Sequence, residues 1–110
     1  MRQLSRLATA AISIGFLTLT LSGLVRAQND ADKLYKTHCV LCHAPDGSGT
    51  SPSGKALKAQ DLRSELIQKK TDAELAAVIT SGKGKMPAFG KKLSDAEINS
   101  LIKYVSDLKK

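Results

Sequence analysis

Hydrophobic residues recur at helical spacing in three separate segments of the chain. In residues 30–41 they predict a first helix, with Asn29 and Asp30 as capping residues at its start. Two stretches rich in glycine, proline and lysine, residues 44–54 and 82–92, have the composition of loops instead. The first helix is therefore expected to be followed by a long coil.

Two further helix starts share one motif, a serine or threonine followed three residues later by glutamate. Thr71 with Glu74 and Ser94 with Glu97 form this capping box, and a stripe of apolar residues follows each. Residues 61–69 predict at most a short helix, and no segment alternates as a β-strand does. The fold class is therefore predicted to be all-α.

The N-terminal segment has the pattern of an export signal. Two arginines precede residues 7–25, which are uncharged and largely apolar, and Val25-Arg26-Ala27 resembles a cleavage site. We expect residues 1–27 to be a signal peptide and residues 28–110 to be the folded domain. The alternative is an uncleaved membrane anchor, since residues 7–25 are near the lower length limit for a spanning helix. Either outcome places the domain outside the cytoplasm.

The folded domain has few large apolar side chains with which to build a core. It contains no tryptophan, and its aromatic residues are Tyr35, Phe89 and Tyr104. Its length is that of one small domain, which excludes a multidomain enzyme. Because so small a domain buries only about 60% of its unfolded surface, a cofactor, metal or disulfide would add much to its stability. The composition therefore predicts that something other than side chains fills the core.

The chain is basic, with 17 lysines and arginines against 10 acidic residues and a net charge of +7. Within residues 28–82 basic and acidic residues balance, so the excess charge of the folded domain lies in residues 83–110. The simpler interpretation is an ordinary solvated surface, and the functional one is a docking patch for an acidic protein partner. We expect no nucleic-acid partner, because the chain has no arginine cluster and no interleaved aromatic residues.

The chain's two cysteines, Cys39 and Cys42, are followed directly by His43 in a C-x-x-C-H motif. A disulfide between them would close only a tiny loop, and a thioredoxin-like redox pair would need a βαβ setting that the pattern does not predict. A zinc site formed by His38, Cys39, Cys42 and His43 is disfavoured, because adjacent residues cannot easily direct both side chains at one ion. The usual second pair of ligands farther along the chain is also missing. Covalent attachment of haem is the favoured interpretation, because C-x-x-C-H is its signature.

Haem attachment also has a physical basis in this spacing. Residues three apart lie on one face of a helix, so the two thiols can form thioethers with the two vinyl groups of one porphyrin. The adjacent His43 then reaches the iron as an axial ligand, a role that suits imidazole. Attachment takes place on a chain carried across a membrane, which agrees with the export signal. We therefore predict one haem c bound through Cys39 and Cys42.

Met86 is the predicted ligand on the other side of the iron. It is the one methionine of the folded domain, and Pro87 restricts its backbone to an extended conformation, away from any helix. A thioether favours ferrous iron and raises the reduction potential. The alternatives are that Met86 fills a gap in the core, or that Lys83 or Lys85 is the ligand. His38 is the other possible ligand, but because it lies directly beside Cys39 it is expected to be an exposed or edge histidine instead.

Taken in order, these motifs resemble those of the class I c-type cytochromes, the small monohaem kind. The resemblance spans residues 28–110 and rests on four features: Leu34-Tyr35 before the C-x-x-C-H motif, the loop Pro45-Asp46-Gly47-Ser48-Gly49, the stretch Gly84-Lys85-Met86-Pro87-Ala88-Phe89, and a terminal helix with Leu101 and Tyr104. It implies a fold of about four helices wrapped around one covalently attached haem, with His43 and Met86 as the axial pair.

The resemblance also implies two structural details. In the family the first and last helices cross in close contact, and Ala31 and Tyr104 match the positions of the small and the aromatic residue at that crossing. The family also uses a loop carbonyl to accept a hydrogen bond from the proximal imidazole. Pro52 is our candidate for that carbonyl, and Pro45 is the alternative.

The function implied by the resemblance is one-electron carriage and not enzymatic catalysis. We expect a monomeric periplasmic protein that takes electrons from a reductase or dehydrogenase and passes them to an oxidase-type acceptor, in a respiratory or related chain. One alternative is haem-based catalysis or gas sensing, which needs an open iron position. The other is a fixed subunit of a larger redox complex. Membrane association is expected only if residues 1–27 are retained.

Overall fold

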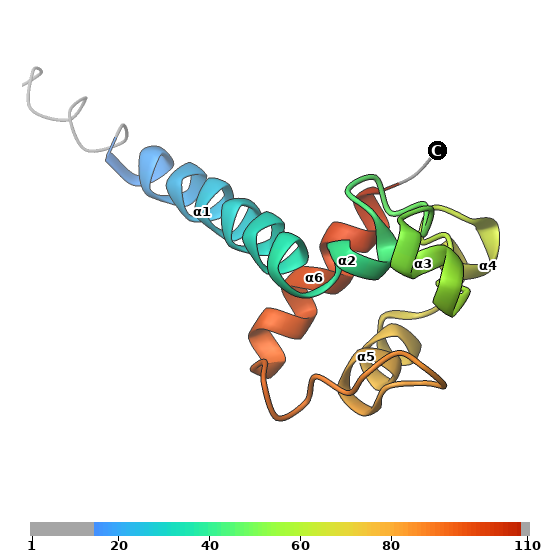
Figure 1. Cartoon of the computed structure of the whole chain (residues 1–110). Helices are drawn as coiled ribbons and strands as arrows, with labels where there is room; N and C mark the ends of the chain where they lie inside the picture. The colour runs from blue at the N-terminus through green and yellow to red at the C-terminus, as the bar shows by residue number, and fades with distance from the viewer. Residues whose placement is uncertain (1–14, 109–110) are drawn as a thin grey trace, which may run out of the picture.

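The computed structural model describes residues 15–108, in which the regular elements are all helices (Figure 1). The prediction of an all-α fold is therefore confirmed. The one extended pairing in the described residues is an isolated bridge between Lys83 and Met86. In chain order the helices are α1 (Gly15–His38), α2 (Val40–His43), α3 (Pro52–Leu57), α4 (Glu65–Gln68), α5 (Asp72–Ser81) and α6 (Asp95–Asp107).

The first helix differs from the prediction at both ends. Asn29 and Asp30 lie inside α1 and not at its start, because the residues before them are helical as well. An Asn or Asp inside a helix costs only about 0.7 kcal/mol relative to Ala, and a helix that has already formed extends readily past it. The predicted range ended at residue 41, whereas α1 ends at His38 and Cys39 separates it from α2.

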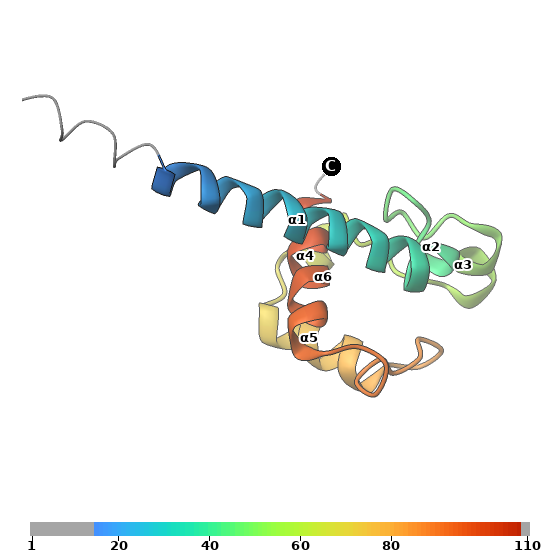
Figure 2. The same ribbon diagram turned by 90° about the vertical axis from the view of Figure 1, so that its left-hand side faces the viewer.

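The predicted export signal is described only in part. Residues 15–27 form the N-terminal half of α1, and residues 1–14 lie outside the described residues. That half of α1 projects away from the other helices in both views (Figures 1 and 2). Within residues 15–108, no helix combines the length and the apolar character needed to cross a membrane.

Both capping boxes predicted from the sequence are present. The Thr71 hydroxyl accepts a hydrogen bond from the Glu74 N–H at 3.2 Å, and the Thr71 N–H donates to the Glu74 carboxylate at 2.7 Å. Ser94 and Glu97 repeat this arrangement with the same distances at the start of α6. The short helix expected within residues 61–69 is α4.

The structure has a helix, α3, where the sequence predicts a loop. Ser51 caps it, since its hydroxyl accepts from the Gly54 N–H at 3.0 Å, and Pro52 occupies the first helical position. Proline is well suited to that position because its missing N–H would have no partner there. The serine, proline and glycine of this segment favour loops as much as helix starts, and the segment is too short to show helical periodicity.

The core lies where α1 crosses α6 (Figures 1 and 2). Tyr35 of α1 stacks on Tyr104 of α6 with ring centroids 4.6 Å apart, and the Tyr104 hydroxyl donates to Asp32 at 3.5 Å. Ala31 is buried on the same helix, so the predicted packing of the first helix on the last is confirmed. The buried cluster around this crossing consists of Tyr35, Phe89, Leu93, Ile98, Leu101 and Ile102.

Replacement of Glu74 should remove part of the pH dependence of stability. The hydrogen bond from the Thr71 N–H holds the pKa of the Glu74 carboxyl below its ordinary value of 4.5. A carboxyl whose pKa is lower in the folded state stabilises the fold above its unfolded pKa, and that effect is lost as the pH falls through the folded pKa. Glu74→Gln should therefore flatten the loss of stability below about pH 4.5, measured by denaturant unfolding.

Thr71→Ala is the matched control, because it removes the capping hydroxyl but keeps the backbone donor to Glu74. It should lower the free energy of unfolding by about 1 kcal/mol at every pH and leave most of the acid-induced loss in place. Equal acid-induced losses in the wild-type protein and Glu74→Gln would contradict the prediction.

Candidate cofactor site

The C-x-x-C-H motif begins at the break between α1 and α2. Cys39 and Cys42 are half-buried free thiols, and burial raises the pKa of Cys39 to about 11. The Cys39 thiol is therefore protonated near neutral pH. The backbone of the motif is a single tight turn, since the Cys39 carbonyl accepts from the N–H groups of Cys42 at 3.2 Å and His43 at 2.9 Å. The two thiols and the imidazole thus come from one short helical segment.

The imidazole of His43 is oriented by a backbone carbonyl. Its Nδ1–H donates to the Gln60 carbonyl oxygen at 3.1 Å, so the proton is on Nδ1 and Nε2 keeps its lone pair. Burial lowers the pKa of His43, with the hydrogen bond to Gln60 acting in the opposite direction. A neutral ring with a free Nε2 is the form of histidine that binds a metal ion.

The carbonyl partner of His43 was predicted wrongly. It belongs to Gln60 and not to Pro52 or Pro45. Pro52 starts α3, and the chain returns to His43 only after that helix ends at Leu57 and Lys58 reverses the chain with a positive φ of 57°. Any residue type supplies a backbone carbonyl, so no side-chain signal at Gln60 could have identified it.

Two backbone hydrogen bonds hold the segment that contains Gln60. The Ala59 N–H donates to the Gly54 carbonyl and the Leu62 N–H donates to the Gly47 carbonyl, each at 2.8 Å. One contact lies on each side of Gln60 in the sequence. The hydrogen bond to the imidazole therefore depends on the loop that follows α2 and on α3.

The α3 segment packs directly on the backbone of α2. The Ser51 hydroxyl donates to the carbonyls of Leu41 at 2.7 Å and Cys42 at 3.1 Å. A Cβ atom added to Gly54 would collide with the Cys42 carbonyl oxygen, so only glycine allows this approach. The main chain that carries the two cysteines is thus covered closely on one side.

Met86 lies in the loop between α5 and α6. It pairs with Lys83 through two backbone hydrogen bonds of 3.0 and 3.1 Å, and the chain enters this tight turn through Gly82 at a φ of 72°. Met86 is half-buried and packs against the same core cluster as Cys39. Two predicted site residues that are far apart in the sequence therefore both contact this core cluster.

Exposed lysines flank the Met86 loop. Lys92 lies with its ammonium 5.8 Å from the centre of the Phe89 ring, a cation–π distance. None of these lysines forms a salt bridge within residues 15–108. Their charges are therefore available to a partner, and the residues concerned are Lys83, Lys85, Lys91 and Lys92.

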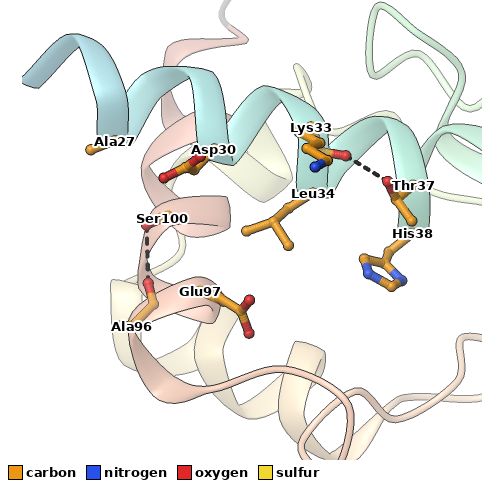
Figure 3. Close-up of a pocket in the computed structure, with 9 residues that line it drawn as sticks. All are labelled: Ala27, Asp30, Lys33, Leu34, Thr37, His38, Ala96, Glu97 and Ser100. Atoms are coloured by element: carbon orange, nitrogen blue, oxygen red, sulfur yellow. Dashed lines mark hydrogen bonds between the residues drawn. The ribbon is translucent and has the colours of Figure 1, made fainter.

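His38 lies at a different site, a cleft of about 600 Å³ between α1 and the start of α6 (Figure 3). His38 is half-buried, and its ring meets the Phe89 ring edge-on with the ring centroids 5.8 Å apart. Asp30, Lys33 and Glu97 give the cleft a mixed charge. None of the four residues predicted to hold the cofactor lines it, so it is separate from the C-x-x-C-H site.

Three comparisons agree on the family. The family model described as subunit III of cbb3-type cytochrome c oxidase matches residues 26–105. The chain is 40% identical over 75 residues to cytochrome c6 of Leptolyngbya boryana, a match covering 68% of this chain and 85% of that protein. It is 35% identical over 80 residues to cytochrome c6 of Picosynechococcus sp., covering 68% of each.

The chain belongs to the class I monohaem c-type cytochromes. A solved c-type cytochrome, KustC0563, has the same fold: it is 33% identical with a TM-score of 0.67, and the match covers 73% of this chain and 98% of that one. The cofactor of this cytochrome is haem c, and the protein is an electron carrier and not an enzyme. It exchanges electrons with protein partners.

The residues present fit that cofactor. The motif supplies two thiols for thioether bonds, and His43 supplies a neutral nitrogen whose ring is already oriented by Gln60. None of the residues of α2 or α5 is fully buried, although α5 is rich in apolar side chains. These two helices thus leave apolar surface uncovered, against which a porphyrin would be able to pack.

Proposed function

We propose that this cytochrome carries single electrons in a respiratory or related chain, with haem attached through Cys39 and Cys42 and the iron bound between His43 and Met86. The observation that carries the proposal is the hydrogen bond from His43 to Gln60, which leaves Nε2 free and fixes the direction of the ring. Haem c supplies reversible one-electron oxidation and reduction at its iron. A match to an oxidase subunit family supports the respiratory assignment.

The two proposed ligands would determine the reduction potential of the iron and whether small molecules can bind to it. The hydrogen bond to Gln60 makes His43 a stronger electron donor, and the soft thioether of Met86 favours the reduced state. Together they fill both axial positions with protein. No position is then left for oxygen or peroxide, which favours electron carriage over haem-based catalysis or gas sensing.

Replacement of Met86 should remove the proposed axial ligand from the iron. Met86→Ala should abolish the weak near-infrared sulfur-to-iron band of the ferric protein, and the ferrous protein should then bind carbon monoxide at neutral pH. Met86→His should also abolish the band and lower the reduction potential, within the roughly 0.8 V range over which axial ligands act. The measurements are absorption spectroscopy and potentiometric titration.

Lys85→Ala is the control for this experiment, because it removes a neighbouring side chain that is one of the two alternative lysine ligands. It should leave the band and the potential of the wild-type protein in place. A wild-type ferric protein without the band, or with a ferrous form that binds carbon monoxide readily, would contradict ligation by Met86.

We propose that the partner surfaces are acidic and dock on the four lysines around the Met86 loop. The support is that these lysines are exposed, carry no salt bridge within the described residues and flank the proposed ligand. Like charges gathered on one face raise the rate of encounter with an oppositely charged partner. The complex would be short-lived, as electron transfer between partners requires.

Oxidation of the reduced protein by membranes that contain a cbb3-type oxidase should slow by roughly tenfold or more as salt is raised, because salt screens the steering field. At low salt, Lys83→Glu and Lys85→Glu should each slow the reaction, and the difference from the wild-type protein should disappear at high salt. The measurement is the rate of haem oxidation followed by absorption.

Lys103→Glu makes the same charge change on α6, where Lys103 is paired with Asp107 at 3.9 Å, and should have little effect. A rate independent of salt would contradict the docking patch. Oxidation by ferricyanide but not by the oxidase membranes would contradict the respiratory acceptor and leave electron carriage intact.

We also propose that residues 1–27 direct export and that the mature protein is periplasmic. The support is the charged start, the apolar stretch and the small residue Ala27 at the expected cleavage position. N-terminal sequencing of the haem-loaded protein from a periplasmic fraction should begin at Gln28. A product that retains Met1 and sediments with membranes would show instead that the segment is an anchor.

A further inference from the structure

The residue after His43 has a backbone conformation that side chains rarely adopt. Ala44 has φ 64° and ψ 164°, in a region that is essentially restricted to glycine. It is buried, with 5% of its surface exposed. Such a conformation costs on the order of 1–3 kcal/mol and persists only where the surrounding structure enforces it. The strain lies at the point where the chain leaves α2.

A buried tyrosine holds this residue in place. The Tyr35 hydroxyl donates to the Ala44 carbonyl at 2.7 Å, and the Gly47 N–H donates to the same oxygen at 3.2 Å. Tyr35 is 1% exposed and is fixed by its stack on Tyr104. Burial raises the pKa of Tyr35 further above its ordinary value, so the hydroxyl remains a donor. The strained residue is thus tied to the crossing of α1 and α6.

A series of hydrogen bonds connects Ala44 to the segment that contains Gln60, the acceptor of the His43 hydrogen bond. The Ala44 carbonyl closes the turn to Gly47, and the Gly47 carbonyl accepts from the Leu62 N–H at 2.8 Å. Leu62 is two residues after Gln60, whose carbonyl accepts from His43 at 3.1 Å. A shift of the Ala44 turn would therefore move the ligand and its acceptor relative to each other.

We propose that Tyr35 is a positioning residue for His43: its hydroxyl holds the strained Ala44 turn and thereby sets the hydrogen bond between His43 and Gln60. The inference rests on the proposed role of His43 as an axial ligand. A weaker hydrogen bond at Nδ1 makes the imidazole a poorer electron donor and disfavours the ferric state. Loss of the Tyr35 hydroxyl should therefore raise the reduction potential.

Tyr35→Phe in the haem-loaded protein removes the hydroxyl and keeps the ring stacked on Tyr104. It should give an upward shift of the reduction potential and lower thermal stability. Tyr104→Phe is the matched control, because it removes a hydroxyl from the other ring of the same stack, one that bonds to Asp32. It should leave the reduction potential unchanged, although it removes a hydrogen bond between α1 and α6.

The double variant Tyr35→Phe/Ala44→Gly tests whether the Tyr35 hydroxyl acts on the reduction potential through the Ala44 turn. Glycine adopts the Ala44 conformation without strain, so the turn no longer needs the hydroxyl. The potential should return to the wild-type value, and if Tyr35→Phe alone yields too little haem-loaded protein, the double variant should restore the yield. A raised potential that glycine does not correct, an unchanged potential in Tyr35→Phe, or failure of both variants to accumulate would overturn the proposal.

The sulfur-to-iron band of the wild-type protein separates this proposal from the one on which it rests. Absence of the band contradicts His43/Met86 ligation, whatever Tyr35 does. Presence of the band together with an unchanged potential in Tyr35→Phe contradicts only the positioning role.

Discussion

The stack of Tyr35 on Tyr104 is the contact on which the rest of the structure depends. A chain without tryptophan and with few other aromatic residues must place its large side chains where they bury most surface, and it places them where the first and last helices cross. An aromatic pair of this kind contributes about 0.5–1.5 kcal/mol beyond the burial of its area. The segment between α1 and α6 contains helices α2 to α5 and all the proposed cofactor residues, and its two ends are held together at this crossing.

A feature of this structure could be predicted from the sequence when neighbouring residues specify it, and could not when only the folded path of the chain does. The starts of α5 and α6 are encoded locally, since Thr71 and Ser94 reach their glutamates within one turn, and both were predicted correctly. The C-x-x-C-H motif likewise predicted the cofactor, because the chemistry needs that spacing. The carbonyl acceptor at Gln60 could not be predicted, because any residue supplies a carbonyl and only the folded path selects one. The extension of α1 through Asn29 and Asp30 was missed because capping residues are also tolerated inside a helix that continues.

The site separates two electrostatic environments. On the side of α2, burial raises the pKa of Cys39 and lowers the pKa of His43, so it disfavours the charged form of both side chains. Around the Met86 loop the lysines are exposed and form no salt bridge with the part of the chain that the structure describes. The residues proposed to tune the iron are thus different from those proposed to recruit partners, so a substitution in one group need not change the other.

The close approach of Gly54 to the Cys42 carbonyl oxygen has a consequence for the sequences that this segment tolerates. The space at this point does not hold a single methyl group, so any residue other than glycine at position 54 would push α3 away from α2. The Gly54 carbonyl also accepts from the N–H of Ala59, the residue before Gln60, so that displacement would reach the acceptor of the His43 hydrogen bond.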